Sequence, residues 1–382
     1  MRYSLPFTKQ ISWLFLLLIF VFSPIQAAAK LVIAQGGASG YLVENSLPAI
    51  ALAIGTGADI IKIDVVLSAD DKVIVLGSPD LAKSSNVAEI FPDRIREDGH
   101  FYALDFTVEE IRSLTLHDPE KRLPEELALH LNIITLEEEL ALIKILDQSL
   151  GKNTRIAIEL RQPWLHRKEG KDLTKPVLTL LQRYGYTGSS DNVSILSYDA
   201  VELRRMRKQL LPEMGMAIQL VQLIESNEGQ ETMTEEWGKW VSYNYDWMFS
   251  KSGLRALTSS VAAIGLPKQL LADPDGKVLL ASFVENAHQL NTRIFTFPVE
   301  KDEQTRMAFA ESFEEELEFF YFTVGVDGIV TNFCKDALHY LQNRPEKSVN
   351  LIDPTQSGSP SVKLTSEDPL QLTSPAALGP KE

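Results

Sequence analysis

Short runs of β-branched and other apolar residues alternate with longer segments of helical periodicity along most of this chain. The first unit is Leu31–Ala34 followed by Leu47–Ile54, in which apolar residues recur three and four positions apart. The strand candidates are Leu31–Ala34, Ile60–Val66, Arg155–Leu160, Asn192–Ile195, Met216–Leu220, Ala262–Leu266, Arg293–Phe297 and Asp327–Thr331. Because a strand followed by a helix recurs about eight times, the pattern favours an α/β fold of the closed (β/α)8 type, the TIM barrel, over an open sheet.

The N-terminal residues 1–29 have the pattern of an export signal peptide. Arg2 and Lys9 precede a predominantly apolar run from Ile11 to Phe22, and small residues follow that run. The run is well short of the roughly 20 residues that span a bilayer. We therefore expect cleavage of the signal, no stable membrane anchor afterwards, and a periplasmic or secreted protein.

Two further segments depart from the alternation. Residues at about 80–134 form a mixed segment that predicts a small insertion after an early strand, in a barrel that spans 30–345. Residues 346–382 are rich in Ser, Pro and Thr and poor in large apolar side chains, which predicts a flexible tail.

Charge and cysteine content exclude several classes of function. The formal net charge is −15, and the Lys and Arg residues are scattered among carboxylates. Nucleic-acid binding requires a concentrated basic face, so we expect no nucleic-acid partner. Cys334 is the only cysteine of the sequence, which excludes an intramolecular disulfide and a multi-cysteine metal site.

The loop after the first strand candidate contains the most informative motif. It reads Gln-Gly-Gly-Ala-Ser at 35–39 and Glu-Asn-Ser at 44–46. This loop resembles the signature loop of glycerophosphodiester phosphodiesterases, in which His-Arg-Gly-Ala-Ser is followed by Pro-Glu-Asn-Thr. The resemblance continues through Ile-Lys-Ile-Asp at 61–64, where the family has a Glu-x-Asp pair, and Leu-Gly-Ser at 76–78, where it has Leu-His-Asp. The resemblance extends over most of the chain. Among the branches of the family, the sequence is similar to the periplasmic bacterial one in particular.

This resemblance implies a reaction and a set of chemical groups. The family hydrolyses a glycerophosphodiester to an alcohol and glycerol 3-phosphate, with two histidines as general acid and base and a divalent cation, Ca²⁺, held by three carboxylates. Imidazole titrates near neutral pH and therefore suits proton transfer at both the attacking and the leaving oxygen. The cation offsets charge on the phosphoryl group.

Carried over position by position, the catalytic groups are replaced in this chain. The two family histidines fall on Gln35 and Gly77, and the arginine beside the first falls on Gly36. Gln35 cannot titrate and glycine has no side chain, so we expect activity to be lost or strongly reduced.

The metal site is altered at the same time. Its three carboxylates fall on Lys62, Asp64 and Glu159, and the family lysine two residues further on falls on Arg161. We expect Ca²⁺ binding to be weak or absent. Two interpretations of Lys62 stay open: its ammonium replaces the cation by pairing with the two carboxylates, or its side chain bends toward solvent after functional drift.

Other residues are candidates for binding or for substitute chemistry. Because Trp164, Tyr198 and Phe297 lie near strand ends, they are expected to line a pocket for an alcohol head group, with Arg161 as a phosphate contact. Glu44 is expected to order the first loop. His100 and His166 are candidates for a replacement catalytic histidine, although a surface position is the favoured interpretation of both.

Two functions from different classes follow. One is a binding protein that has lost turnover and holds a small glycerophosphodiester or glycerol phosphate. The other is a slow or substrate-altered phosphodiester hydrolase that uses Asp64, Glu159 and Arg161.

Overall fold

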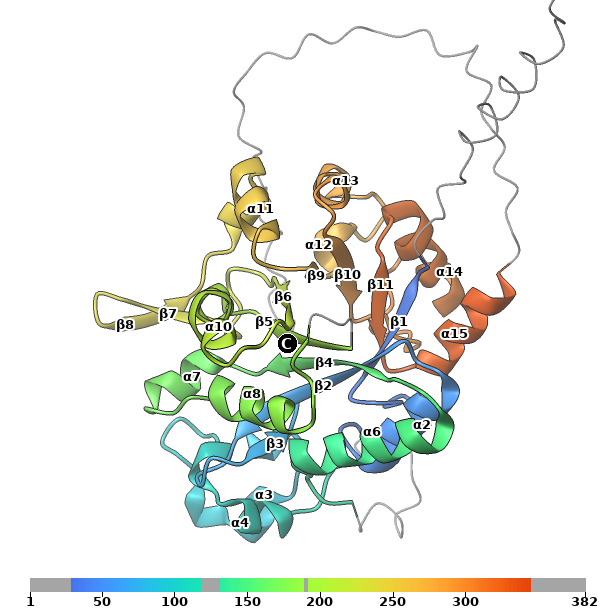
Figure 1. Ribbon diagram of the computed structural model, residues 1–382. Coiled ribbons are helices and arrows are strands. Elements are labelled where there is room, and N and C mark those ends of the chain that lie inside the picture. Colours follow the sequence, from blue (N-terminus) through green and yellow to red (C-terminus); the bar gives the residue numbers. More distant parts are fainter. Residues whose placement is uncertain (1–28, 118–130, 189–191, 345–382) are drawn as a thin grey trace, which may run out of the picture. The chain divides into compact units, whose positions relative to one another are not determined.

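The computed structural model describes residues 29–117, 131–188 and 192–344. Eight parallel strands form a ring that closes because β1 pairs with both β2 and β11. Helices lie around the outside of this ring (Figure 1). In order around the barrel the strands are β1 (Leu31–Gln35), β2 (Ile60–Leu67), β4 (Arg155–Leu160), β5 (Val193–Ser197), β6 (Gln219–Leu223), β9 (Ala263–Pro267), β10 (Arg293–Phe297) and β11 (Gly328–Thr331). The predicted TIM barrel is confirmed.

Helices follow the barrel strands, and several of them have a side-chain cap at the N-terminus. The longer ones are α2 (Leu47–Thr56), α6 (Leu136–Leu150), α8 (Thr174–Arg183), α11 (Lys251–Thr258), α13 (Ala281–Gln289) and α15 (Cys334–Asn343). The shorter ones are α3 (Val87–Ile90), α4 (Val108–Arg112), α7 (Pro163–Lys168), α9 (Ala200–Arg205), α10 (Leu211–Glu213), α12 (Lys268–Leu271) and α14 (Phe313–Glu318). In α2 the Ser46 hydroxyl accepts from the Ala49 N–H, and Gly57 ends the helix in the left-handed region. No helix in the described ranges is long and apolar enough to cross a membrane.

One strand prediction was displaced along the chain. The apolar run Met216–Leu220 predicted the fifth barrel strand, but β6 begins at Gln219 and ends at Leu223. Gln219 pairs with Ser194 and Gln222 with Ser197. The Gln222 amide is fully buried and donates to the carbonyls of Tyr198 and Leu223. The buried Gln222 therefore lies in the part of the strand that extends beyond the apolar run marking it in the sequence.

The segment between β3 (Val73–Val75) and α6 has its own small core. β3 pairs antiparallel with the end of β2, and apolar side chains of the segment pack beneath this pair. Buried members include Leu76, Leu81, Phe101, Phe106 and Ile111. In Figure 1 the segment lies at the end of the barrel that carries β3, with α3 and α4 on its outer side. Residues 118–130, within the predicted insertion, lie outside the described residues.

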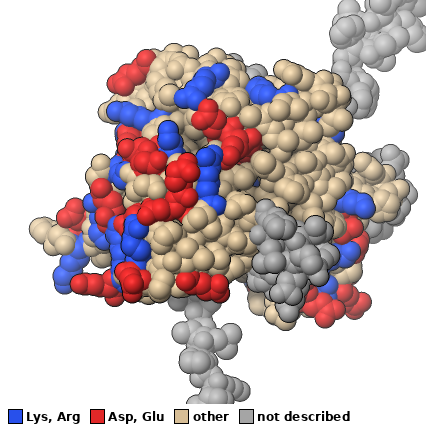
Figure 2. Space-filling view, turned by 90° about the horizontal axis from the view of Figure 1, so that it is seen from below, with Lys and Arg blue, Asp and Glu red and all other residues tan. Residues whose placement is uncertain are grey.

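A two-stranded hairpin of β7 (Met233–Glu236) and β8 (Lys239–Ser242) stands apart from the barrel and was not predicted. The predicted signal peptide, up to residue 28, and the predicted tail lie outside the described residues. On the face seen in Figure 2, acidic and basic side chains of the described residues are interspersed.

Candidate active site

The C-terminal ends of β1, β2 and β4 bring together residues that the sequence places far apart. In the strand register Gln35 is the partner of Lys62, and Asp64 is the partner of Glu159. Arg161 lies two positions after Glu159 and is the first residue beyond the end of β4. Because all these strands are parallel, their side chains meet at one mouth of the barrel, where enzymes of this fold place their chemistry.

Lys62 lies between the two remaining carboxylates of the predicted metal site. Its Nζ is 2.5 Å from Asp64 Oδ1 and 2.7 Å from Glu159 Oε2. The Lys62 residue is only 6% exposed, and Asp64 and Glu159 are 2% and 1% exposed. The alternative in which this side chain bends toward solvent is therefore wrong.

Electrostatics keep this ammonium charged. Burial alone would lower the pKa of Lys62, but Asp64 and Glu159 outweigh burial and raise that pKa. Burial would likewise raise the pKa of Asp64, whereas the positive charges of Lys62 and Arg161 hold it below its ordinary value. The three groups form an internal ion triad in which each carboxylate bonds the same ammonium.

The described residues do not fit the Ca²⁺ site that the family implies. Calcium takes six to eight oxygen ligands. Here the ammonium lies within bonding distance of both remaining carboxylates and so takes the place between them. Within the described ranges, no group of three or more His, Cys, Asp or Glu side chains is arranged to hold a metal ion.

Gln35 is fixed by the carboxylates on either side of it. Its Nε2 donates to Glu44 Oε1 at 2.9 Å and to Asp64 Oδ2 at 2.8 Å. Burial, with a smaller contribution from the charge of Asp64, raises the pKa of Glu44. The amide therefore holds the site together where the family has a group that transfers protons.

The two glycines at family catalytic positions differ in the space around them. Gly36 has a φ of +53°, and a Cβ at this position would lie 2.4 Å from Glu44 Cγ. An arginine here would require both a strained backbone and a displaced Glu44. A Cβ on Gly77 would instead meet Asn45 Nδ2 and Asp64 Oδ2 at 3.7 Å, an ordinary contact distance. The second family histidine could therefore be restored, whereas the arginine could not be restored without rearrangement.

Arg161 is paired on both sides. One end of its guanidinium bonds Glu159 and the other bonds Glu231, a residue of the loop that leads into β7. Burial, opposed by the positive charge of Arg161, raises the pKa of Glu231 to about 7. Glu231 was not identified from the sequence. Its acidic loop carries no recognisable motif, and it lies 70 positions from Arg161.

The predicted pocket residues fall into two groups. The Tyr198 and Phe297 rings meet edge to face, with centroids 6.3 Å apart, above the apolar interior of the barrel. The Trp164 indole packs at a tilt of 38° against Trp240, with ring centroids 5.3 Å apart, and donates to the Gln230 carbonyl at 3.3 Å. Trp164 therefore packs on the hairpin and on the loop that carries Glu231.

Neither candidate histidine belongs to this cluster. His166 is fully buried, where its Nε2 accepts from the Leu67 N–H at 3.1 Å and its Nδ1 lies 3.1 Å from the Gln162 carbonyl oxygen. Burial lowers the pKa of His166 to about 4, so its ring is neutral. The prediction of a surface position was wrong for His166. His100 is 44% exposed in its side chain and contacts Asp80 in the segment after β3.

Comparison with known proteins identifies the family to which this chain belongs. The family model for the glycerophosphoryl diester phosphodiesterase family matches residues 36–336. The chain belongs to this family. A glycerophosphodiester phosphodiesterase of Treponema pallidum is 34% identical over 80% of this chain and 90% of its own length. A glycerophosphodiester phosphodiesterase of Haemophilus influenzae is 32% identical over 82% of this chain and 90% of its own.

A solved structure supports the same fold. The structure is that of a phosphodiesterase of Oleispira antarctica in complex with the product sn-glycerol-3-phosphate. It matches this family member with a TM-score of 0.56 at 15% identity, over 82% of this chain and 97% of that one. At this level of identity the likeness concerns the barrel itself.

Proposed function

We propose that this protein binds the glycerol phosphate part of a small phosphodiester or phosphomonoester and does not hydrolyse it by the reaction of its family. The observation that carries the proposal is the position of Lys62, whose ammonium bonds both Asp64 and Glu159. A cation fixed in the protein makes the site independent of Ca²⁺, and it leaves no open coordination position for a phosphate oxygen.

Loss of proton transfer supports the same proposal. Gln35 and Gly77 stand at the positions of the family histidines; the Gln35 amide does not titrate and Gly77 has no side chain. General acid–base catalysis contributes about 10² to 10⁴ in rate for each group. Replacing both groups is therefore expected to suppress turnover by several orders of magnitude, even where the two effects are not additive.

Binding of an anionic ligand rests on Arg161. Its guanidinium already binds the carboxylate of Glu231 in the barrel mouth. The end of the guanidinium that faces the loop is therefore positioned to bind an oxyanion. A ligand phosphate would bind by displacing Glu231. Tyr198 and Phe297 would then offer an apolar wall to the rest of the ligand.

The decisive experiment measures turnover and binding on the same preparation. Release of glycerol 3-phosphate from glycerophosphocholine is followed with and without Ca²⁺, and glycerol 3-phosphate binding is followed by calorimetry. The expected result is binding without turnover and no response to Ca²⁺. Turnover that depends on Ca²⁺ and is abolished by Asp64→Asn would contradict the proposal.

A restored variant tests whether the substitutions are the cause. Lys62→Glu, Gln35→His and Gly77→His return the metal-site carboxylate and both proton-transfer groups, whereas Gly36 stays because a side chain there would strike Glu44. Calcium-dependent turnover is expected in this triple variant. The matched control omits Lys62→Glu and is expected to remain inactive, because the ammonium still lies between the carboxylates.

A second candidate function, slow hydrolysis, is favoured by Glu231. A carboxyl group with a pKa of about 7 beside Arg161 is suited to proton transfer at neutral pH. If this group acts as the catalytic acid or base, residual turnover will be lost in Glu231→Gln and unchanged by chelators. Residual turnover that survives Glu231→Gln would exclude this role.

We also propose a location in the cell envelope, in the periplasm or outside the cell. The support is the export signal pattern of residues 1–29, a basic start followed by an apolar run and small residues. Fractionation of expressing cells, with N-terminal sequencing of the product, tests both export and cleavage. A full-length product in the cytoplasm would refute this location.

A further inference from the structure

A pocket opens at the N-terminal mouth of the barrel, opposite the mouth that holds the candidate active site. Its volume is about 200 Å³. The polar lining includes Arg155, Arg293, Ser194 and Gln219, and the apolar part includes Val221 and Phe295. Arg155 is the first residue of β4, whereas Glu159 of the candidate site lies near the end of the same strand. At about 3.3 Å per residue, the two sites are separated by roughly 13 Å along the strand.

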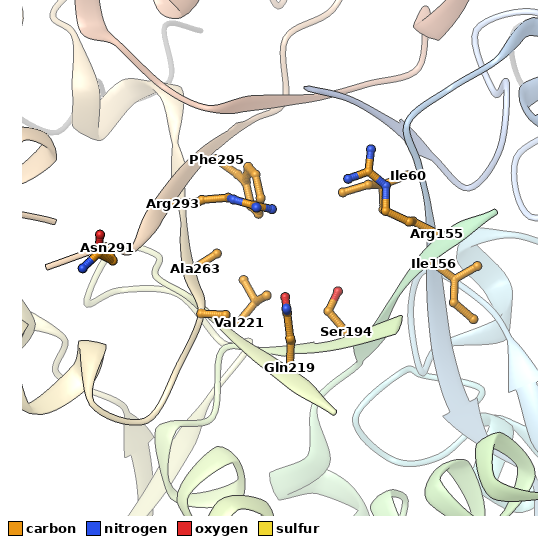
Figure 3. A pocket seen from close by; sticks show the side chains of 11 residues that line it. Ile60, Arg155, Ile156, Ser194, Gln219, Val221, Ala263, Asn291, Arg293 and Phe295 are labelled. Atoms are coloured by element: carbon orange, nitrogen blue, oxygen red, sulfur yellow. The ribbon is translucent and has the colours of Figure 1, made fainter. Parts of the chain in front are cut away.

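The two arginines face this pocket from opposite walls. In the closed ring, β4 and β10 are four strands apart in either direction. Arg155 and Arg293 are the first residues of these strands, at the same end of the barrel. Figure 3 shows both side chains reaching from opposite sides into the space between the strands.

The guanidinium groups keep donors available for a ligand. Arg155 Nε donates to the Asp59 carbonyl, and its Nη2 lies 3.6 Å from Asp59 Oδ1, so this arginine is anchored at one side only. Across the described ranges, no carboxylate forms an ion pair with Arg293. Both positive charges face the same cavity, where one anion could interact with the two guanidinium groups together.

The pocket also has the size and chemistry of a small-anion site. Its volume is well above the roughly 10–15 Å³ that a single water requires, so it has room for a phosphate or a short organic acid. Guanidinium groups bind phosphate and carboxylate through paired hydrogen bonds. Because the whole chain carries a net charge of −15, a basic cavity of this kind is not a consequence of the general charge.

We propose that this pocket binds a small oxyanion, a phosphate monoester or a short-chain carboxylate, between Arg155 and Arg293. Ser194 and Gln219 contribute polar groups to the wall between the arginines, and Val221 and Phe295 contribute apolar surface. This site is separate from the candidate active site and independent of the function proposed there.

The test uses calorimetric titration of the purified protein at constant ionic strength, because salt screens exposed charges. The probes are inorganic phosphate and succinate, which separate phosphate from carboxylate ligands and are not the ligand proposed for the candidate active site. The test variant is Arg293→Gln, whose side chain forms no ion pair with the described residues. The matched control is Arg255→Gln on α11, an exposed position outside the pocket with the same change in charge.

The expected result is binding of at least one probe to the unmodified protein and to Arg255→Gln. A loss of about tenfold to a hundredfold in affinity is expected in Arg293→Gln, as for removal of a charged hydrogen-bonding partner. Arg155→Gln should weaken binding in the same direction. Equal affinity in Arg293→Gln and Arg255→Gln would place the bound anion elsewhere and overturn the proposal, as would no binding of any probe at millimolar concentration.

Discussion

Glu139 offers the sharpest test of the electrostatics derived from this structure. It lies in the first turn of α6, is fully buried, and both of its carboxyl oxygens lack a hydrogen-bond partner in the described part of the chain. Burial, with a smaller effect of Asp64, raises the pKa of Glu139 from 4.5 to about 8. The buried carboxyl group is therefore protonated in the folded protein at neutral pH.

The direction of the pH effect follows from this pKa. The folded state binds the proton more tightly than the unfolded state, so the stabilisation is complete below pH 4.5 and is lost as the pH rises toward 8. At about 1.4 kcal/mol per pKa unit, Glu139 removes roughly 3 to 4 kcal/mol from the free energy of unfolding between pH 5 and pH 8.

Glu139→Gln isolates this contribution. Glutamine has nearly the same shape and stays neutral at every pH, so any cost of burying its amide is the same at pH 5 and pH 8. Urea unfolding followed by tryptophan fluorescence should show the variant gaining about 3 kcal/mol relative to the unmodified protein over this interval. The control is Glu137→Gln, an exposed position on the same helix that loses a surface ion pair with Arg183, for which the change should stay within about 1 kcal/mol. Parallel stability curves for Glu139→Gln and the unmodified protein would refute the reasoning.

Three other perturbations have defined outcomes. Lys62→Met leaves Asp64 and Glu159 buried without their shared cation, and urea unfolding should show the free energy of unfolding fall by about 3 to 5 kcal/mol. The double variant Lys62→Met with Asp64→Asn should recover much of this loss. The phosphodiester group of glycerophosphocholine keeps its negative charge between pH 6 and pH 8. The affinity should therefore rise by about tenfold as the pH falls over this range and Glu231 is protonated, and it should become independent of pH in Glu231→Gln. Lys268 Nζ pairs with Glu316 Oε1 at 2.8 Å in the core, so Lys268→Met should lower the melting temperature and Lys268→Met with Glu316→Gln should restore part of the loss.

The barrel and the core of the candidate site could be predicted because both follow from local pattern. Short apolar strands alternate with helices along the sequence, and in a barrel of parallel strands the residues at the C-terminal ends of all strands lie at the same mouth of the barrel. Gln35, Lys62, Asp64 and Glu159 are therefore brought together as the motifs indicate. The distances among these side chains, including the ion pairs of Lys62 with both carboxylates, depend on how deeply the side chains are buried. A short stretch of sequence does not contain that information.

What could not be predicted depends on contacts between distant segments. Glu231 reaches Arg161 from a loop 70 positions away, and no periodicity or spacing links the two. His166 follows a strand end, as a catalytic residue would, but it accepts from the backbone of Leu67, 99 positions earlier. In both cases the role of the side chain is set by a hydrogen-bond partner that only the folded chain provides.

The ion triad argues that the substitutions at this site are matched to one another. Three family carboxylates with a divalent cation carry a net charge of −1, and two carboxylates with the Lys62 ammonium also carry −1. Each oxygen of the two carboxylates is bonded: Asp64 to Lys62 and Gln35, and Glu159 to Lys62 and Arg161. Unrelated changes in a buried site would be expected to leave some of these oxygens unpaired, at a cost of several kcal/mol for a charged group. Two carboxylates whose oxygens are all bonded, with an unchanged charge at the position of the family metal cluster, are what selection for a stable barrel mouth would produce.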